Sequence, residues 1–224
     1  PKNEGWLLTT APELAKRPTR GIHDALVKLA ADKKKEMRLR AISMLARLRT
    51  KESVTAASAA ILAEKDGATR REAASTLFSV EEIFRRCDAA KSVEAGLADK
   101  DSGVRYVYAM VSPRDLQAAI PVLRADGLKA SDHHVRESAA LELGQRGDGS
   151  GESLLITLLA RDRMPGVTDD RGLEERLLTS EQVAICEVLG KLGSANGKAA
   201  LQKATASKLE PVRKAAEKAL AAGK

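Results

Sequence analysis

Apolar and small residues recur along this chain at intervals of three and four positions, which is the spacing of one face of an α-helix. In residues 135–143, for example, Val135, Ala139 and Leu143 fall on one face, while Arg136 lies off it. Second apolar segments alternate with stretches of this kind, at 54–62, 89–97, 116–123, 153–159 and 199–206. The pattern predicts pairs of helices joined by short turns, with one face of each helix buried.

Six of these stretches align on a common anchor position. The anchor residues are Arg38, Arg70, Arg105, Arg136, Gln182 and Arg213. Their spacings are 32, 35, 31, 46 and 31 residues, so one interval is about 15 residues longer than the period. Small residues three positions after the anchor and leucines seven positions after it support the same register in most copies. A shared period of this size predicts a stack of helical repeats.

The recurring Asp and Arg residues have a structural explanation. An Asp four positions before the anchor stands just ahead of a helix, where its carboxylate accepts hydrogen bonds from free backbone N–H groups. The Arg can bind carbonyls at a helix end or the Asp of its own or a neighbouring turn. We therefore expect a structural ladder of Asp66, Arg70, Asp101, Arg105, Asp132, Arg136 and Arg213. The alternative is that these guanidinium groups hold phosphates or carboxylates on a concave surface.

One copy carries a family resemblance. Residues 132–144 follow the pattern Asp-x-x-Val-Arg-x-x-Ala-Ala-x-x-Leu-Gly, which resembles the HEAT-like repeats, in particular the short variety named after phycobilin-lyase subunits. The resemblance covers about residues 20–222. It implies an all-α fold, a right-handed α–α superhelix of about six helical hairpins, with the Arg-bearing second helices on the concave side. It implies little about chemistry, because this architecture serves many unrelated functions.

The same register divides the chain into a cap and an array. We expect an N-terminal capping segment at 1–18, where Trp6 covers the first helix pair, and a HEAT-like repeat array at 19–224. The long interval contains Pro165, two glycines and several acidic residues, which predicts an inserted loop at 161–176. Because the chain begins with Pro1, we expect a monomeric domain of a larger protein.

Composition agrees with closely packed helices. Of 224 residues, 38 are Ala, 43% are hydrophobic and 2% are aromatic, which excludes disorder and disfavours a β-sandwich. No segment has the length and hydropathy of a membrane span or the order of a signal peptide. We expect Cys87 and Cys186 to be two buried thiols, with one disulfide or a reactive site as the alternatives. The compartment stays open, with the cytoplasm favoured and export as the alternative.

Positive charge is concentrated in the N-terminal part of the chain. The net charge is +7, and residues 1–66 hold 14 basic and 8 acidic side chains. In the helix predicted to follow Lys33, we expect Arg40, Ser43 and Arg47 on one face, with Lys51 beyond. Such a face attracts nucleic acid, an anionic membrane or an acidic protein, or it is simply solvated. Few aromatics are present for stacking on bases, and Tyr106 is the one expected to be exposed.

The chain shows no catalytic, cofactor or metal motif. None of its three histidines, His23, His133 and His134, precedes a Glu, so the pattern of iron-binding HEAT hydroxylases is absent. The acidic pairs of the 161–176 insertion lack calcium-loop spacing. We interpret this insertion as a partner-contact loop, with a tolerated flexible insertion and a cation site as the alternatives.

The prediction is therefore a non-enzymatic scaffold that binds a protein partner on the concave helical surface. The alternatives are sequence-independent binding of duplex nucleic acid through the basic N-terminal face, and a phycobilin-lyase-like enzyme subunit. No cofactor is expected. The residues expected to contact a partner are Arg40, Arg47, Lys51, Arg71, Tyr106, Arg163, Asp169 and Asp170.

Overall fold

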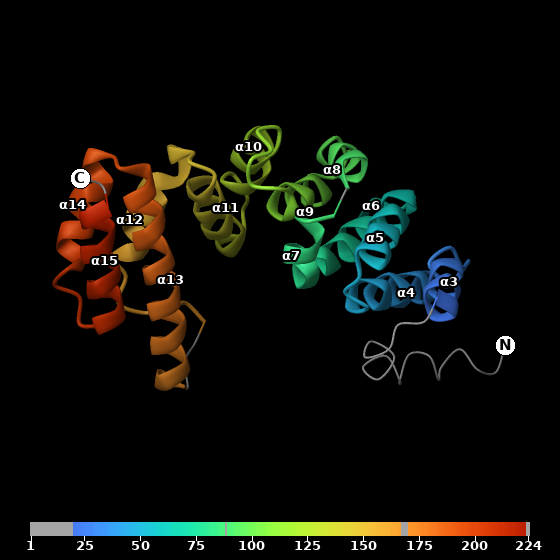
Figure 1. The fold of residues 1–224 in the computed structure, drawn as a ribbon, viewed down its shortest axis with the longest axis horizontal. Coiled ribbons are helices and arrows are strands. Elements are labelled where there is room, and N and C mark those ends of the chain that lie inside the picture. The colour runs from blue at the N-terminus through green and yellow to red at the C-terminus, as the bar shows by residue number, and fades with distance from the viewer. Residues whose placement is uncertain (1–19, 88, 167–169, 223–224) are drawn as a thin grey trace. The chain divides into compact units, whose positions relative to one another are not determined.

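The computed structural model describes residues 20–87, 89–166 and 170–222. In those ranges the chain forms helices and turns and no strand. It divides into two compact units, an N-terminal unit at 1–122 and a C-terminal unit at 123–224. The expected capping segment with Trp6 lies outside the described residues, as does Asp169 of the insertion. Figure 1 shows the helices of both units, coloured along the chain.

The N-terminal unit consists of antiparallel helix pairs that follow one another along the chain (Figure 1). Helix α3 packs against α4, α5 against α6, and α8 against α9, while α6 continues into the 3₁₀ segment η1 and the single turn α7. The elements are α3 Arg20–Leu29, α4 Lys35–Arg47, α5 Lys51–Ala63, α6 Gly67–Ala74, η1 Ser75–Val80, α7 Glu81–Phe84, α8 Ala90–Leu97, α9 Ser102–Val111 and α10 Ala119–Val122.

Side-chain caps begin the anchored helices where the sequence predicts them. Asp66 accepts a hydrogen bond from the backbone N–H of Thr69 at 2.8 Å, which satisfies one free donor of α6. Asp101 does the same for α9, and Asp132 accepts from the N–H of His134 at the start of α11. The recurring Asp therefore sets where these three second helices begin.

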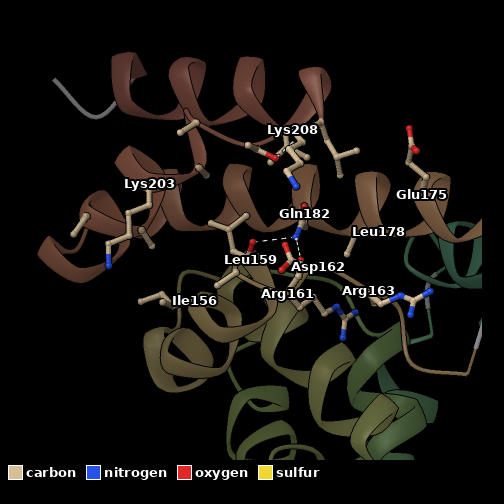
Figure 2. Close-up of a pocket in the computed structure, with 18 of the residues that line it drawn as sticks. Ile156, Leu159, Arg161, Asp162, Arg163, Glu175, Leu178, Gln182, Lys203 and Lys208 are labelled. Carbon is tan, nitrogen blue, oxygen red and sulfur yellow. Dashed lines mark hydrogen bonds between the residues drawn. The ribbon is translucent and has the colours of Figure 1, made fainter.

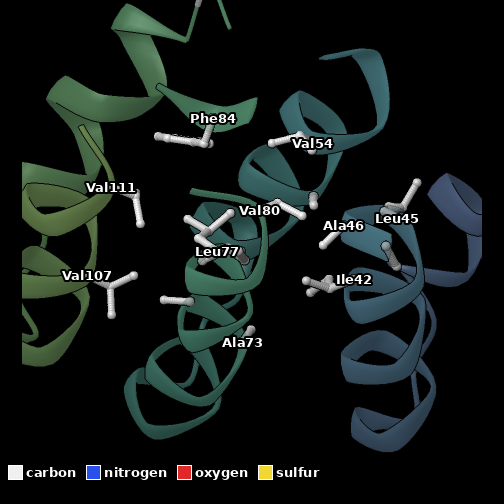
Figure 3. Close-up of a cluster of buried hydrophobic side chains, with 14 of the residues drawn as sticks. Ile42, Leu45, Ala46, Val54, Ala73, Leu77, Val80, Phe84, Val107 and Val111 are labelled. Carbon is white, nitrogen blue, oxygen red and sulfur yellow. The ribbon is translucent and has the colours of Figure 1, made fainter. Parts of the chain in front are cut away.

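The core of this unit is built from the apolar positions of the repeat. Ile42, Leu45, Leu77 and Phe84 are at most 1% exposed and lie between successive helices (Figure 3). These side chains come from α4, η1 and α7, so each pair buries its apolar face against its neighbours. Burial of this kind is the main stabilising term of such a stack.

One repeat places a large residue where the others have a small one. Tyr108 stands at the position of Ala41 and Ala73, yet its ring is fully buried. Gly96 of α8 makes the room, because a Cβ at this position would stand 2.1 Å from Tyr108 Cγ. The Tyr108 hydroxyl lies 2.8 Å from Ser58 Oγ, so its polar end has a partner, and burial raises its pKa.

The C-terminal unit continues the same arrangement with one irregular pair. The π-helical segment η2 packs against α11, α12 against α13, and α14 against α15, and α13 also contacts α11 and α15. Its core includes Leu155, Ile185, Leu189, Leu201 and Val212, all at most 1% exposed. The elements are η2 Leu123–Gly127, α11 His133–Gln145, η3 Gly149–Gly151, α12 Glu152–Leu159, α13 Arg171–Leu192, α14 Ala195–Ala204 and α15 Glu210–Ala222.

The insertion is shorter as a loop than the sequence predicts. Residues 171–176 are helical and belong to α13, which spans 22 residues. Asp170 caps this helix by accepting a hydrogen bond from the N–H of Leu173 at 2.9 Å. The prediction of a loop to residue 176 was wrong because Gly172 and the acidic residues were taken as loop signals. Acidic residues are in fact favourable in a first helical turn.

The expected fold class is confirmed: the described chain is all-α and built from stacked helical hairpins. Both cysteines are free thiols, and burial raises the pKa of Cys186 to about 11. Within the described ranges, the helices are too short or too polar to cross a membrane.

Candidate functional site

The five anchor arginines make the same pair of contacts. In each case Nη1 donates to the backbone carbonyls six and five positions earlier, where the preceding helix ends or the turn runs. Arg136, for example, donates to Ala130 and Ser131 at 2.7 Å each, and Arg213 donates to Ser207 at 2.7 Å. The remaining contacts are those of Arg38 with Asp32 and Lys33, Arg70 with Glu64 and Lys65, and Arg105 with Asp99 and Lys100. These bonds satisfy carbonyls that the helix leaves free.

In the N-terminal unit a carboxylate links Arg38 to the repeat of Arg70, and another links Arg70 to the repeat of Arg105. Glu64 accepts from Arg38 Nε at 2.7 Å through its side chain, while its backbone carbonyl accepts from Arg70. Asp99 repeats this arrangement one repeat later, with Arg70 at 2.7 Å and Arg105. The hydrogen bond from Arg38 lowers the pKa of Glu64. At Asp99 burial alone would raise the pKa, but the bonds from Arg70 and from the backbone N–H of Asp101 together outweigh it, so this pKa is also lowered.

In the fifth repeat Gln182 stands at the anchor position, and its side chain binds backbone carbonyls as the anchor arginines do elsewhere. Its Nε2 donates to the backbone oxygens of Leu159 at 3.0 Å and Arg161 at 2.8 Å (Figure 2). The side chain is 4% exposed, so these are buried contacts at the end of α12. A shorter neutral residue thus holds the loop that carries the insertion.

A large groove lies next to this irregular repeat. It has a volume of about 1190 Å³ and is lined by α12, α13, α14, the start of α15 and residues 160–163 (Figure 2). Its apolar lining includes Ile156, Leu159, Leu178 and Val212. A groove of this size with an apolar lining and scattered polar groups is typical of a ligand or peptide site. Both departures from the repeat, Gln182 and the insertion, line it.

Some charges of the groove have partners. Arg163 lies 3.4 Å from Glu174, and Glu152 accepts a hydrogen bond from Ser194. Five further charged residues line the groove without an ion pair to any residue that the structure describes. These residues are Arg171, Lys203, Lys208, Asp162 and Glu175.

An ionic cluster fixes the wall of the groove. Arg161 bridges Glu137 of α11, at 3.2 Å, and Glu181 of α13, with 14% of its side chain exposed. Burial raises the pKa of Glu181 despite the neighbouring guanidinium. Because Arg161 also accepts the bond from Gln182, the loop after α12 is held at both its side chain and its backbone.

Of the residues predicted to contact a partner, four in the N-terminal unit are exposed. Arg40 and Arg47 lie on α4 and Lys51 begins α5. Arg71 pairs with Asp101, and this ion pair lowers the pKa of Asp101 to about 2. Whether these residues bind a partner stays a prediction.

The prediction that Tyr106 is exposed was wrong. Its side chain is buried at 8% exposure, and its ring centroid lies 6.4 Å from that of Phe78. Phe78 is 40% exposed instead. The reason is that η1 follows α6 directly and lays Phe78 against the Tyr106 ring, which an analysis of helical faces does not anticipate.

The insertion residues have different positions. Arg163 lines the groove, whereas Asp170 caps α13. Lys203 and Lys208 also line the groove, although the sequence pattern does not predict it. The signal that pointed to this region was the coincidence of a long interval with a lost anchor Arg.

The described residues include no group of three His, Cys, Asp or Glu side chains that could hold a metal ion. The groove offers apolar surface and charged side chains.

No protein-family model matches this chain, and no curated protein matches it either. Among solved structures, it is similar to an engineered protein at 21% identity and a TM-score of 0.59, over 90% of this chain and 96% of that one. A second engineered protein has 21% identity and a TM-score of 0.62; the match covers 97% of this chain and 62% of that protein, so less than two thirds of its length. Human deoxyhypusine hydroxylase matches at 15% identity over 96% of this chain and 88% of that one. Its TM-score of 0.36 is too low to indicate a shared fold. The first two similarities establish a shared fold.

Proposed function

We propose that this protein is a non-enzymatic, HEAT-like scaffold, and that its partner is a protein segment bound in the groove of the C-terminal unit. The observation that carries the proposal is the coincidence of that groove with both irregularities of the repeat. In the other repeats, packing, helix capping and contacts with backbone carbonyls explain the recurring residues. The insertion has no counterpart in the other repeats, and it lies beside an apolar groove.

The groove favours an amphipathic segment as its occupant. Apolar side chains of the segment would cover the accessible apolar lining, such as Ile156, Ala199 and Leu209, and this burial supplies most of the affinity. Among the groove charges without a described partner, three are basic and two are acidic. We therefore expect acidic residues beside the apolar ones, placed against Lys203 and Lys208. Such ion pairs set the orientation of the bound segment more than they raise its affinity.

The test is a peptide-display selection on the full chain. Ala199 of α14 is exposed and lines the groove, so Ala199→Trp fills the groove without removing a core side chain. Gln202→Trp adds the same side chain to an exposed position of α14 that does not line the groove. Peptides selected on the wild type are then measured by calorimetry on all three proteins.

We expect the enriched peptides to combine apolar and acidic residues. They should bind wild type and Gln202→Trp equally, and lose at least about tenfold in affinity with Ala199→Trp, because a filled groove excludes the anchoring side chain. Peptides that bind all three proteins equally, or a selection that enriches none, would overturn the proposal.

A further inference from the structure

The excess positive charge of the described chain lies in its first three helices. Residues 20–63, which span α3 to α5, hold ten basic and four acidic side chains, against a net charge of +7 for the whole chain. Of these bases, Arg38 is neutralised by Glu64, and Lys35 lies 3.2 Å from Glu72. The remaining surface of these three helices still carries a strong local excess of positive charge, which is typical of a polyanion-binding site.

Helix α4 arranges part of this charge in a row. Glu36, Arg40, Ser43 and Arg47 are spaced by three or four residues, so they follow one line along the helix. Both arginines are exposed, and the two are separated by about 10 Å of helical rise. Lys51 follows after a short turn, at the first residue of α5. Within the described residues, none of these three bases forms an ion pair.

The repeat does not require this row. In the next repeat of the same unit, the residues that correspond to Arg40 and Arg47 are Glu72 of α6 and Ser79 of η1. In α9 the residue that corresponds to Arg40 is Val107. A pair of arginines at these positions is therefore particular to α4, and packing does not explain it.

We infer that the α4 row, Arg40, Ser43 and Arg47 extended by Lys51, is a binding site for the sugar-phosphate backbone of duplex nucleic acid. A straight row of two guanidinium groups and a hydroxyl offers donors that phosphates accept without reading sequence. No aromatic side chain lies in the row, so bases are not stacked and a duplex is the fitting form. An anionic membrane fits less well, because the row has no apolar residue to insert.

The experiment is fluorescence anisotropy with the full chain and a labelled duplex of about 20 base pairs, repeated over a range of salt concentrations. Arg40→Gln/Arg47→Gln removes two charges from the row. Lys203→Gln/Lys208→Gln removes the same charge from the groove of the C-terminal unit and is the matched control. Glu36→Gln removes the one acidic member of the row.

We expect the wild type to bind in the micromolar range at low salt, with an affinity that falls steeply as salt rises. The Arg40/Arg47 variant should bind at least about tenfold more weakly, and its salt slope should fall by about 2, since each lost phosphate contact removes close to one unit. Glu36→Gln should bind more tightly, and the groove control should match the wild type. Circular dichroism confirms that each variant is folded.

Wild-type affinity weaker than about 100 μM at low salt overturns the inference. Equal losses of duplex affinity in the Arg40/Arg47 variant and in the groove control also overturn the inference, because binding would then depend on net charge alone. Capture of the protein by phosphatidylserine vesicles in an Arg40/Arg47-dependent manner, without duplex binding, assigns the row to a membrane instead. Peptide binding in the groove is measured separately, so the two proposals stand or fall independently.

Discussion

The two units use one repeat pattern with different regularity. In the N-terminal unit the anchors follow one another without interruption, and Glu64 and Asp99 tie each to the next. The C-terminal unit contains the insertion, the lost anchor at Gln182 and a groove of about 1190 Å³. Where the repeats follow one another without interruption, the Asp and the anchor Arg of the pattern are used for structure. The comparison teaches that departures from the pattern are the better guide to a binding site.

The largest effect should come from Gly96→Ala in the N-terminal unit. A Cβ at this position would overlap the fully buried Tyr108 ring at 2.1 Å, so the ring or the backbone of α8 must shift. We expect a loss of about 3 kcal/mol in the free energy of unfolding, at the upper end for overpacked cores. Chemical denaturation followed by circular dichroism measures it.

Gly67→Ala is the control for this change. Its Cβ would meet its nearest neighbour at 3.9 Å, and alanine favours the helix that begins there. Stability should stay the same or rise slightly. Equal losses from the two substitutions would show that Gly96 is needed for its backbone and not for the Tyr108 ring.

The ladder predicts a difference between anchors of the two units. Arg70→Met removes carbonyl contacts and leaves Asp99 buried without its guanidinium partner, for an expected loss of about 2 kcal/mol. Arg213→Met removes bonds to the carbonyls of Ser207 and Lys208 and should cost about 1 kcal/mol.

Hydrogen exchange localises the two losses. Amides of α6 to α9 should exchange faster in Arg70→Met, and those of α14 and α15 in Arg213→Met. If the two variants lose equal stability, the Asp99 link contributes nothing beyond the carbonyl bonds.

Gln182→Ala tests the irregular repeat with a smaller expected effect. Two carbonyl groups at the end of α12 lose their buried donor, so we expect a loss of about 1 kcal/mol. Peptides of residues 158–166 should show faster hydrogen exchange, because the loop after α12 loses one of its anchors while the contacts of Arg161, Arg163 and Met164 remain. Unchanged exchange in this segment would contradict the role assigned to Gln182.

Much of this fold follows from the sequence because each repeated residue has a local task. Asp66 and Asp101 start helices, and Leu45 and Leu77 fill the core. The site was harder to predict because it depends on contacts between segments far apart in sequence. Lys208 reaches the groove only through the stacking of α15 beside α13, which a periodic pattern does not specify.

The two errors have physical causes of the same kind. Tyr106 was predicted to be exposed, but Phe78 of η1 covers it, so a tertiary contact decided its burial. Residues 171–176 were read as loop, but the Asp170 cap extends α13 through them. In each case a contact with one neighbouring side chain decided the outcome, against what the local sequence pattern predicts.

The smallest predicted effect concerns the acid stability of the ladder. The pKa of Asp99 is lowered in the folded chain, so its carboxylate stabilises the fold above the ordinary value of 3.8 and loses this effect as pH falls through the lowered pKa. Asp99→Asn removes the titration while it keeps the shape. The wild type should therefore exceed the variant by up to about 1 kcal/mol at pH 7, and the difference should vanish toward the acid limit. Other carboxylates titrate in both proteins and cancel in the comparison. A difference that is constant with pH would mean that Asp99 acts through packing and not through its charge.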